Sequence, residues 1–183
     1  MAKWRKDVYR LENPEAWQAK EGYQIFVADQ GAVRFDFPET WVMLPGDTSF
    51  KFYDQQPPDD NCLLEMSIFH LPAGPDWSQL PLKQLLMDTV TGDTKDVLSR
   101  GEAVYLKRGD LEIAWLETCF VDPGEHREAR SRCCLARRGN IQPLFTFAFW
   151  PEDAERVTPV WDEVLRTLRL GEFVAMPIRR GRN

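Results

Sequence analysis

The sequence EAVYLKRGDLEIAWLETCFVDPGEHREARSRCCLARRGNIQPLFTFAFW runs from Glu102 to Trp150 and alternates long apolar segments with three turn signals. The turn signals are Gly109-Asp110, Asp122-Pro123-Gly124-Glu125 and Gly139. Proline presets φ and glycine accepts a positive φ, so each signal is typical of a tight turn. Strands that are joined by tight turns pair antiparallel. The stretch therefore predicts a meander of four antiparallel strands.

The first hairpin of this meander has the most specific turn chemistry. Glycine at the first position of the two-residue loop Gly109-Asp110 suits a type II′ turn. Such a loop would pair Val104 with Trp115 and Leu106 with Ile113 on one face, and Tyr105 with Ala114 on the other. The strand that follows the loop, residues 111–121, is apolar at both parities, so we expect it in the interior of the sheet.

The last hairpin can be closed in two ways, and they place its arginines on different faces. If Gly139 belonged to a two-residue loop, Phe145, Phe147 and Phe149 would share a face with Arg130 and Arg132. We expect instead a three-residue loop, Arg137-Arg138-Gly139, because it separates the charges from the phenylalanines. The apolar face would then comprise Ala129, Ser131, Leu135, Ile141, Phe145 and Phe147.

Further strands and two helices are predicted outside the meander. The strands are Tyr23–Ala28, Val33–Phe37, Val42–Leu44, Ser49–Tyr53 and Cys62–Leu71. One helix is predicted from Pro81 to Val90, with Leu82, Leu85, Leu86 and Val90 on one stripe. The other is predicted from Pro159 to about Leu170, with Thr158 as its N-cap. These elements indicate an α+β fold, in which a twisted antiparallel sheet of about six to eight strands is packed with helices.

Length and charge narrow the organisation and the partners of the protein. The chain has 183 residues, which suits a single domain over 23–171 with an N-terminal extension at 1–22 and a basic C-terminal tail at 172–183. Its net charge is −6 and its pI is about 5.0. A surface of this sign argues against nucleic-acid binding and against binding to an anionic membrane.

Leader, membrane and cysteine patterns point to a soluble cytoplasmic protein. The N-terminus has no apolar segment of the kind found in secretory signals, and no stretch is long enough to span a membrane. Cys62, Cys119, Cys133 and Cys134 lie in apolar segments without C-x-x-C spacing. Reduced cysteines of this kind behave as small apolar residues. We expect no metal and no cofactor.

The segment Val33-Arg34-Phe35-Asp36-Phe37-Pro38-Glu39-Thr40-Trp41 resembles the strand, Pro, acidic residue, x, Trp entry of the PsbP-like fold. This superfamily includes the photosystem protein PsbP, the Ran-binding factor Mog and several bacterial families. The order of the predicted elements is also similar over about residues 23–171. The resemblance implies an α/β/α sandwich with mainly non-enzymatic relatives, among them assembly factors, envelope proteins and adaptors. No functional residue of these relatives can be carried over to this chain.

One cluster on the last hairpin is a candidate ligand site. In the three-residue-loop register, one sheet face would gather Cys134 and six candidate ligand residues, His126, Arg130, Arg132, Gln142, Thr146 and Trp150. Arginine offers planar, forked donors to a carboxylate or a phosphate. The alternative is that this is the solvated side of the sheet, with the arginines paired to Glu128 or to other acids.

No motif of the common hydrolases, nucleotide enzymes or zinc proteases occurs in the sequence. Together with the resemblance, this leads us to expect a non-catalytic domain that binds another macromolecule, a protein, as an adaptor or assembly factor. An exposed apolar patch is expected near the loop Gln55–Asn61 or the N-terminal segment. Two alternatives stay open. One is a small-molecule or anion-binding protein or enzyme that uses the Arg130/Arg132/Trp150 face, and the other is a homo-oligomeric structural protein.

Overall fold

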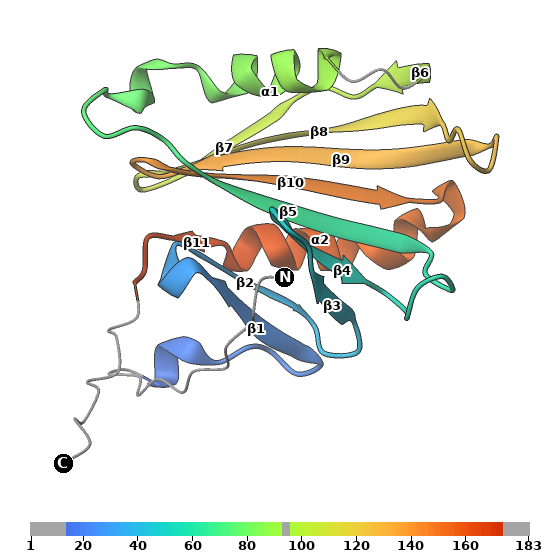
Figure 1. The fold of residues 1–183 in the computed structure, drawn as a ribbon, viewed down its shortest axis with the longest axis horizontal. Coiled ribbons are helices and arrows are strands. Elements are labelled where there is room, and N and C mark those ends of the chain that lie inside the picture. Colours follow the sequence, from blue (N-terminus) through green and yellow to red (C-terminus); the bar gives the residue numbers. More distant parts are fainter. Residues whose placement is uncertain (1–13, 93–95, 174–183) are drawn as a thin grey trace.

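A computed structural model describes residues 14–92 and 96–173 of the chain. Its main feature is an eight-stranded antiparallel sheet with the order β3-β4-β5-β10-β9-β8-β6, in which β7 also pairs with β8 (Figure 1). The strands are β3 (Val42–Pro45), β4 (Ser49–Tyr53), β5 (Cys62–His70), β6 (Asp96–Arg100), β7 (Val104–Arg108), β8 (Leu111–Val121), β9 (Glu128–Arg137) and β10 (Ile141–Phe149). The predicted antiparallel α+β fold is confirmed. Strand β6 was not predicted.

The first hairpin of the meander forms as its turn chemistry predicts. Arg108 pairs with Leu111, so Gly109 and Asp110 make a two-residue loop, and Gly109 has a φ of 60°. The three predicted pairs Val104–Trp115, Leu106–Ile113 and Tyr105–Ala114 are all present. Strand β8 is interior, since β9 lies along one edge and both β7 and β6 lie along the other.

The predicted register of the last hairpin is wrong. Arg138 pairs with Ile141, which leaves the two-residue loop Gly139-Asn140, and Gly139 has a φ of 57°. Phe147 therefore lies opposite Arg132, and Phe149 lies opposite Arg130. The charges are accommodated on this face because acids and hydroxyls from other elements reach them, which the pattern of one hairpin does not reveal.

The second turn also differs in detail from its prediction. His126, rather than Gly124, adopts a positive φ, of 53°. The side chain of Asp122 organises the loop, because its Oδ1 atom accepts hydrogen bonds from the backbone N–H groups of Gly124 and Glu125. A short polar side chain of this kind stabilises a turn without a glycine in the left-handed region.

A separate three-stranded sheet, which was not predicted, contains β1 (Tyr23–Ala28), β2 (Val33–Pro38) and β11 (Arg169–Leu170) in the order β1-β2-β11. The bounds of β1 and β2 match the predicted strands to within one residue. Strand β11 joins it from the far end of the chain, with Leu170 opposite Val33.

The first predicted helix is confirmed and the second is shifted. Helix α1 (Leu82–Thr91) buries Leu82, Leu86 and Val90. Helix α2 runs from Ala154 to Thr167, directly after a 3-10 turn at Pro151–Asp153. Thr158 is therefore inside the helix and donates a hydrogen bond to the carbonyl of Ala154, so it is not the N-cap, and Pro159 is also inside. Further 3-10 turns lie at Pro14–Trp17, Asp29–Gly31 and Trp77–Gln79.

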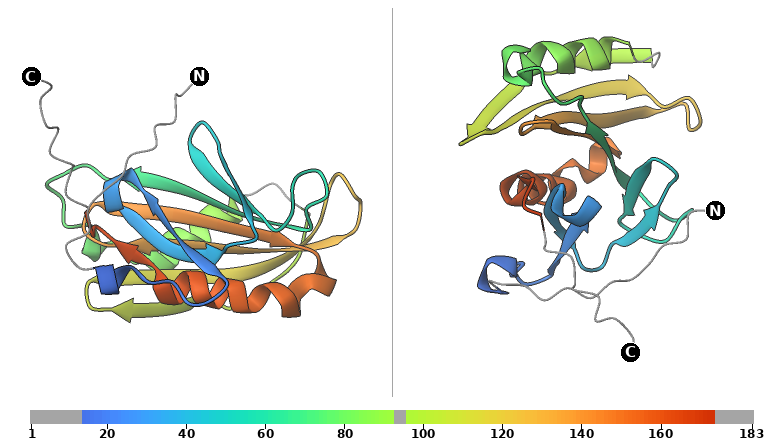
Figure 2. Two further views of the ribbon diagram at one scale, coloured as in Figure 1. Left: turned by 90° about the horizontal axis from the view of Figure 1, so that it is seen from below. Right: turned by 60° about the vertical axis from the view of Figure 1, so that its left-hand side comes forward.

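The elements form three layers, with the eight-stranded sheet in the middle (Figures 1 and 2). Helix α1 covers one face, where Leu86 packs with Ala114, Leu116 and Leu135. Helix α2 and the small sheet cover the other face and enclose the larger core. Within this core, Phe35 and Phe145 lie 5.5 Å apart, and the rings of Trp161 and Phe147 are stacked at 5.9 Å. We call these the α1 face and the α2 face of the sheet.

Two predicted segments fall largely outside the described residues. Only residues 14–22 of the N-terminal extension and residues 172–173 of the basic tail are described, and the proposed boundaries at 23 and 171 stay a prediction. No helix in the described part of the chain is long and apolar enough to cross a bilayer.

Candidate functional site

The six residues predicted to share one binding face lie in different places. Arg130 and Arg132 lie on the α2 face, opposite Phe149 and Phe147. Thr146 lines a cavity beside α1, and Gln142 has the same parity in β10, so both lie on the α1 face. His126 lies in the turn after β8, and Trp150 follows β10. The common face that was expected for these residues therefore does not form.

Arg130 and Arg132 both pair with one acid from the neighbouring strand. Arg132 donates from Nε to Oε2 of Glu117 at 2.9 Å and from Nη2 to Oγ1 of Thr158 at 2.8 Å. Arg130 Nη1 lies 3.4 Å from Oε1 of the same Glu117. Only 7% of Arg132 is exposed. Acids pair with the arginines, as the alternative expects, but α2 covers this face, so it is not the solvated side of the sheet. Binding of an external anion here stays a prediction.

Trp150 has a cationic neighbour that was not among the predicted six. The guanidinium carbon of Arg127 lies 3.6 Å from the centre of the Trp150 ring, and Nη1 of Arg127 donates to Glu152 at 2.8 Å. Trp150 and Arg127 therefore contact each other directly at this end of the sheet.

Strand β7 lies at the margin of the main sheet (Figure 1), and its residues are exposed along the whole strand. Among the described residues it pairs only with β8, so its outer edge is open. Val104, Tyr105 and Leu106 are 38%, 43% and 44% exposed. An exposed apolar edge strand is a ready template for pairing with another chain. Strand β7 is thus the candidate for the expected apolar patch, rather than the loop Gln55–Asn61, and residues 1–13 of the N-terminal alternative lie outside the described residues.

The backbone groups that face the open edge follow from the turn. A two-residue hairpin closes with a hydrogen-bonded pair, here Arg108 and Leu111, and the bonded pairs then alternate along the ladder. Leu106 and Val104 therefore bond to β8. The N–H and C=O groups of Tyr105 and Lys107 point to the open edge.

An apolar groove of about 410 Å³ lies between β7 and α2. Val104, Leu106 and Trp115 line it from the sheet, and Leu165 lines it from the helix. We call β7 and this groove together the β7 edge site. It combines free backbone hydrogen-bonding groups with an apolar channel for side chains.

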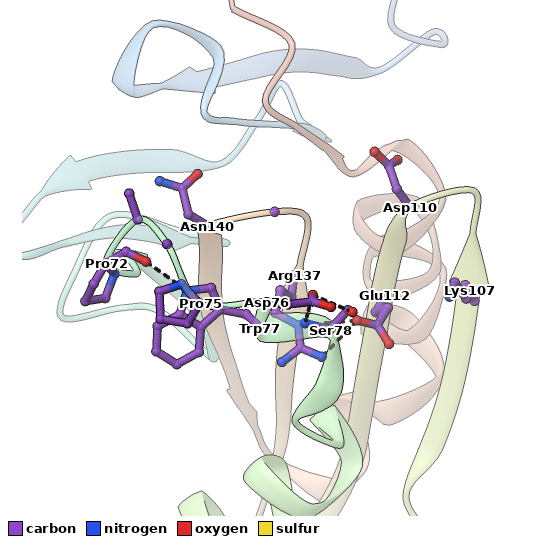
Figure 3. A pocket seen from close by; sticks show the side chains of 13 residues that line it. Pro72, Pro75, Asp76, Trp77, Ser78, Lys107, Asp110, Glu112, Arg137 and Asn140 are labelled. Carbon is purple, nitrogen blue, oxygen red and sulfur yellow. Dashed lines mark hydrogen bonds and ion pairs between the residues drawn. The ribbon is translucent and has the colours of Figure 1, made fainter.

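A second concavity, of about 550 Å³, lies on the α1 face, at the end of the sheet where the hairpins turn (Figure 3). We call it the hairpin-end pocket. Its walls are the segment 72–78 and parts of β7, β8, β9 and the turn after β9. Lys107, Glu112 and Arg137 form a row across three strands, because Lys107 pairs with Glu112 and Glu112 pairs with Arg137.

Arg137 is the most deeply buried charged residue of this pocket, at 2% exposed. Its Nη2 donates to Oε2 of Glu112 at 2.9 Å and to the carbonyl of Leu80 at 2.7 Å. Burial opposes ionisation of Glu112, but hydrogen bonds from Tyr105 and Arg137 outweigh it, and the pKa of Glu112 is lowered. Arg137 was not among the predicted site residues because the predicted three-residue loop included it. The two-residue-loop register would have placed it on the α1 face.

The described residues contain no group of three or more His, Cys, Asp or Glu that could hold a metal ion. All four cysteines are free, and Cys62, Cys133 and Cys134 are buried. Burial raises the pKa of Cys62 to about 12, so its thiol is not nucleophilic at neutral pH. His70 ends β5 and bonds to Asp29, and both side chains are about half exposed.

Comparison with known proteins gives one full-length match in sequence. The profile of the Alr1449 family matches residues 24–174. The protein alr1449 of Nostoc sp. (strain PCC 7120) is 46% identical over 175 residues, which cover 95% of this chain and 91% of the Nostoc protein.

Solved structures match the fold. Cyanobacterial PsbP (CyanoP) from Synechocystis sp. PCC 6803 has a TM-score of 0.59 at 13% identity, over 83% of this chain and 94% of CyanoP. LpqN of Mycobacterium tuberculosis, described as involved in cell envelope biogenesis, has a TM-score of 0.52 at 10% identity, over 81% of this chain and 90% of LpqN. The predicted PsbP-like fold is confirmed, and at these identities the likeness concerns the fold alone.

Proposed function

This chain belongs to the Alr1449 family, and we propose that it is a non-catalytic protein-binding module, an adaptor or assembly factor, that takes an extended segment of its partner along β7. The observation that carries the proposal is the β7 edge site. Its strand has an open outer edge among the described residues, and its apolar side chains are more than a third exposed.

The chemistry of the β7 edge site suits addition of one more strand to the sheet. The outward N–H and C=O groups of Tyr105 and Lys107 would bond to the backbone of the incoming segment. Alternate side chains of that segment would then enter the groove beside Leu106 and Trp115. A segment with apolar residues at every second position fits this arrangement.

The proposal separates backbone recognition from side-chain recognition, so two substitutions test it. Tyr105→Pro removes an outward N–H, and proline is tolerated on an edge strand. Tyr105→Phe is the matched control, because it removes only the hydroxyl that donates to Glu112. Leu106→Glu places a charge at the apolar groove, and Leu98→Glu, on exposed β6, is its control.

The experiment is affinity capture from a lysate of the native organism, with each variant run in parallel on a sizing column. Proteins captured by the wild type, Tyr105→Phe and Leu98→Glu should be lost with Tyr105→Pro and Leu106→Glu. If all variants captured the same proteins in equal amounts, the proposal would be contradicted. A wild-type dimer that Tyr105→Pro converts to a monomer would show that the occupant of the edge is a second copy of the chain.

We also propose a cytoplasmic location. Three buried cysteines and one half-buried cysteine without a disulfide support a reducing compartment. Fractionation of native cells should recover the protein with cytoplasmic enzymes, and recovery with the envelope fraction would contradict this location.

A further inference from the structure

The hairpin-end pocket contains donors that have no acceptor in the described structure. The Nη1 atom of Arg137 is buried and has no hydrogen-bond partner, although the same guanidinium uses its other nitrogens on Glu112 and Leu80. Leaving a buried donor unpaired is unfavourable. In the described part of the chain, Arg130 Nε and Arg132 Nη1 are also buried without a hydrogen-bond partner, but of these three residues it is Arg137 that lines the hairpin-end pocket, where an acceptor could bind. In Figure 3 the guanidinium lies between Glu112 and Trp77.

A second unused cation lies in the same row of residues. Lys107 lines the pocket opposite Glu112, and it has no ion-pair partner in the described ranges. Because Glu112 is neutralised by Arg137, the row Lys107–Glu112–Arg137 carries a net charge of +1. Asp76, whose hydrogen bonds come from neutral groups, brings one negative charge to the same lining, so an anion would be held by local contacts to Lys107 and Arg137 and not by a net positive charge of the pocket.

The acids that line the pocket are already satisfied by protein groups. Asp76 accepts from the backbone N–H and hydroxyl of Ser78 and from the amide of Gln79, and these hydrogen bonds lower the pKa of Asp76. Asp110 accepts from Nε of Arg138 at 2.8 Å. Among the described residues, the buried hydrogen-bonding group of this lining that is left without a partner is thus a donor, Arg137 Nη1, which a ligand with acceptor oxygens would match.

The size of the hairpin-end pocket and the residues of its walls narrow the class of ligand further. A volume of about 550 Å³ is within the range of small-molecule sites. Pro72, Pro75 and Trp77 supply an apolar wall, and the indole N–H of Trp77 is already bonded to the carbonyl of Pro72. Three acids in the same lining disfavour a multiply charged phosphate ester. We propose that the hairpin-end pocket binds a small, singly charged carboxylate with a flat or apolar body, held by Arg137 and Lys107.

This inference goes beyond the proposed function and is independent of it. The β7 edge site uses the outward backbone of β7 and the α2 face, whereas the carboxylate would lie on the α1 face. The two sites share Lys107, through its backbone in the first and its side chain in the second. Titration with a small molecule needs no protein partner, so one result can fail without the other. Leu106→Glu serves as the marker of the edge site in the same titration, because Tyr105→Pro would also remove the hydrogen bond from the Tyr105 hydroxyl to Glu112 of the pocket.

The test is an NMR titration of the full chain with benzoate, and with benzamide as the neutral isostere. Benzoate should shift the Trp77 indole N–H and the Arg137 Nε–H resonances and saturate at about millimolar concentration. Benzamide should bind about tenfold more weakly, because it lacks the charge that Arg137 and Lys107 recognise. The Trp77 resonance is assigned by its loss in Trp77→Phe.

Lys107→Met is the variant that keeps the fold, since Lys107 is exposed, and Lys83→Met on α1 is its matched control. Lys107→Met should weaken benzoate binding by about threefold, whereas Lys83→Met should leave it unchanged. The proposal is overturned if the two resonances do not shift with benzoate, if benzamide binds as tightly, or if Lys107→Met binds like the wild type. Arg137→Lys, checked for folding by urea titration, should weaken binding further than Lys107→Met.

Discussion

At the scale of single residues, Arg132 shows how a charge is built into the larger core. Its guanidinium carbon lies 5.2 Å from the ring centre of Phe149 and 5.8 Å from that of Trp115. Two of its nitrogens bond to Glu117 and Thr158, which come from β8 and α2. Arg132 therefore joins a strand and a helix of the α2 face, and its geometry is that of a structural residue.

We predict that Arg132→Ala lowers the free energy of unfolding by about 2–3 kcal/mol, because Glu117 is left with a single long contact to Arg130 and the packing on Phe149 is lost. The measurement is urea unfolding at neutral pH. Arg127→Ala is the control, since the Arg127–Glu152 pair is largely exposed and should contribute much less. Equal losses in the two variants would contradict a structural role for Arg132.

At the scale of elements, the hairpin loop Arg108-Gly109-Asp110 closes the end of helix α2. Arg108 donates from Nη1 to the carbonyl of Arg166 at 2.6 Å, and from Nη2 to the carbonyl of Leu165 at 2.7 Å. A weaker contact reaches the carbonyl of Leu168 at 3.3 Å. Carbonyls of the last turn have no partner inside a helix, and a cation at this end also matches the helix dipole. The loop spells the integrin-recognition tripeptide, but its arginine is engaged within the fold.

We predict that Arg108→Ala destabilises the protein by about 1–2 kcal/mol and that the loss is concentrated at the end of α2. Hydrogen exchange should accelerate in the last turn of α2 and in β11, which follows it. Arg108→Lys should restore only part of the protection, because one ammonium cannot reach both carbonyls with the geometry of a guanidinium. Unchanged exchange at the end of α2 in Arg108→Ala would rule out the cap.

At the scale of the whole molecule, one sheet separates two apolar cores. Alternate residues of β8 enter different cores, since Ile113 packs on the α2 face and Ala114 packs on the α1 face. The α1 core is the smaller one and includes Leu82, Leu86 and Val90 from the helix. Because both cores share the backbone of β8 and β9, neither can lose its packing without disturbing the strands of the other.

We predict that Leu86→Ala, in the α1 core, lowers the free energy of unfolding by about 2–4 kcal/mol and that the protein still unfolds in one transition. Amides of α1 and of β2, which lie on opposite sides of the main sheet, should lose hydrogen-exchange protection by the same amount. Trp161→Phe is the corresponding substitution in the α2 core and is measured in the same way. Loss of protection confined to α1 in Leu86→Ala would show that the α1 layer unfolds separately.

Local patterns in the sequence were sufficient to predict most of the helices and strands and the fold class. The apolar alternation and glycine position of the Gly109-Asp110 hairpin specify its register, and the stripe of Leu82, Leu86 and Val90 specifies helix α1. Local sequence patterns likewise predicted strands β1, β4 and β5. Each of these elements is determined by residues that are close to one another in the sequence, so it can be predicted from a single sequence.

Only the tertiary structure decided where the arginines lie. Both registers of the hairpin at Gly139 satisfy local turn chemistry, and a shift of one residue exchanges the two faces of a strand. The observed register depends on Glu117 and Thr158, which reach Arg132 from β8 and from α2. The same register places Arg137 beside Glu112 in the hairpin-end pocket. Burial of a charge depends on partners that are distant in sequence, and no local pattern reports their approach.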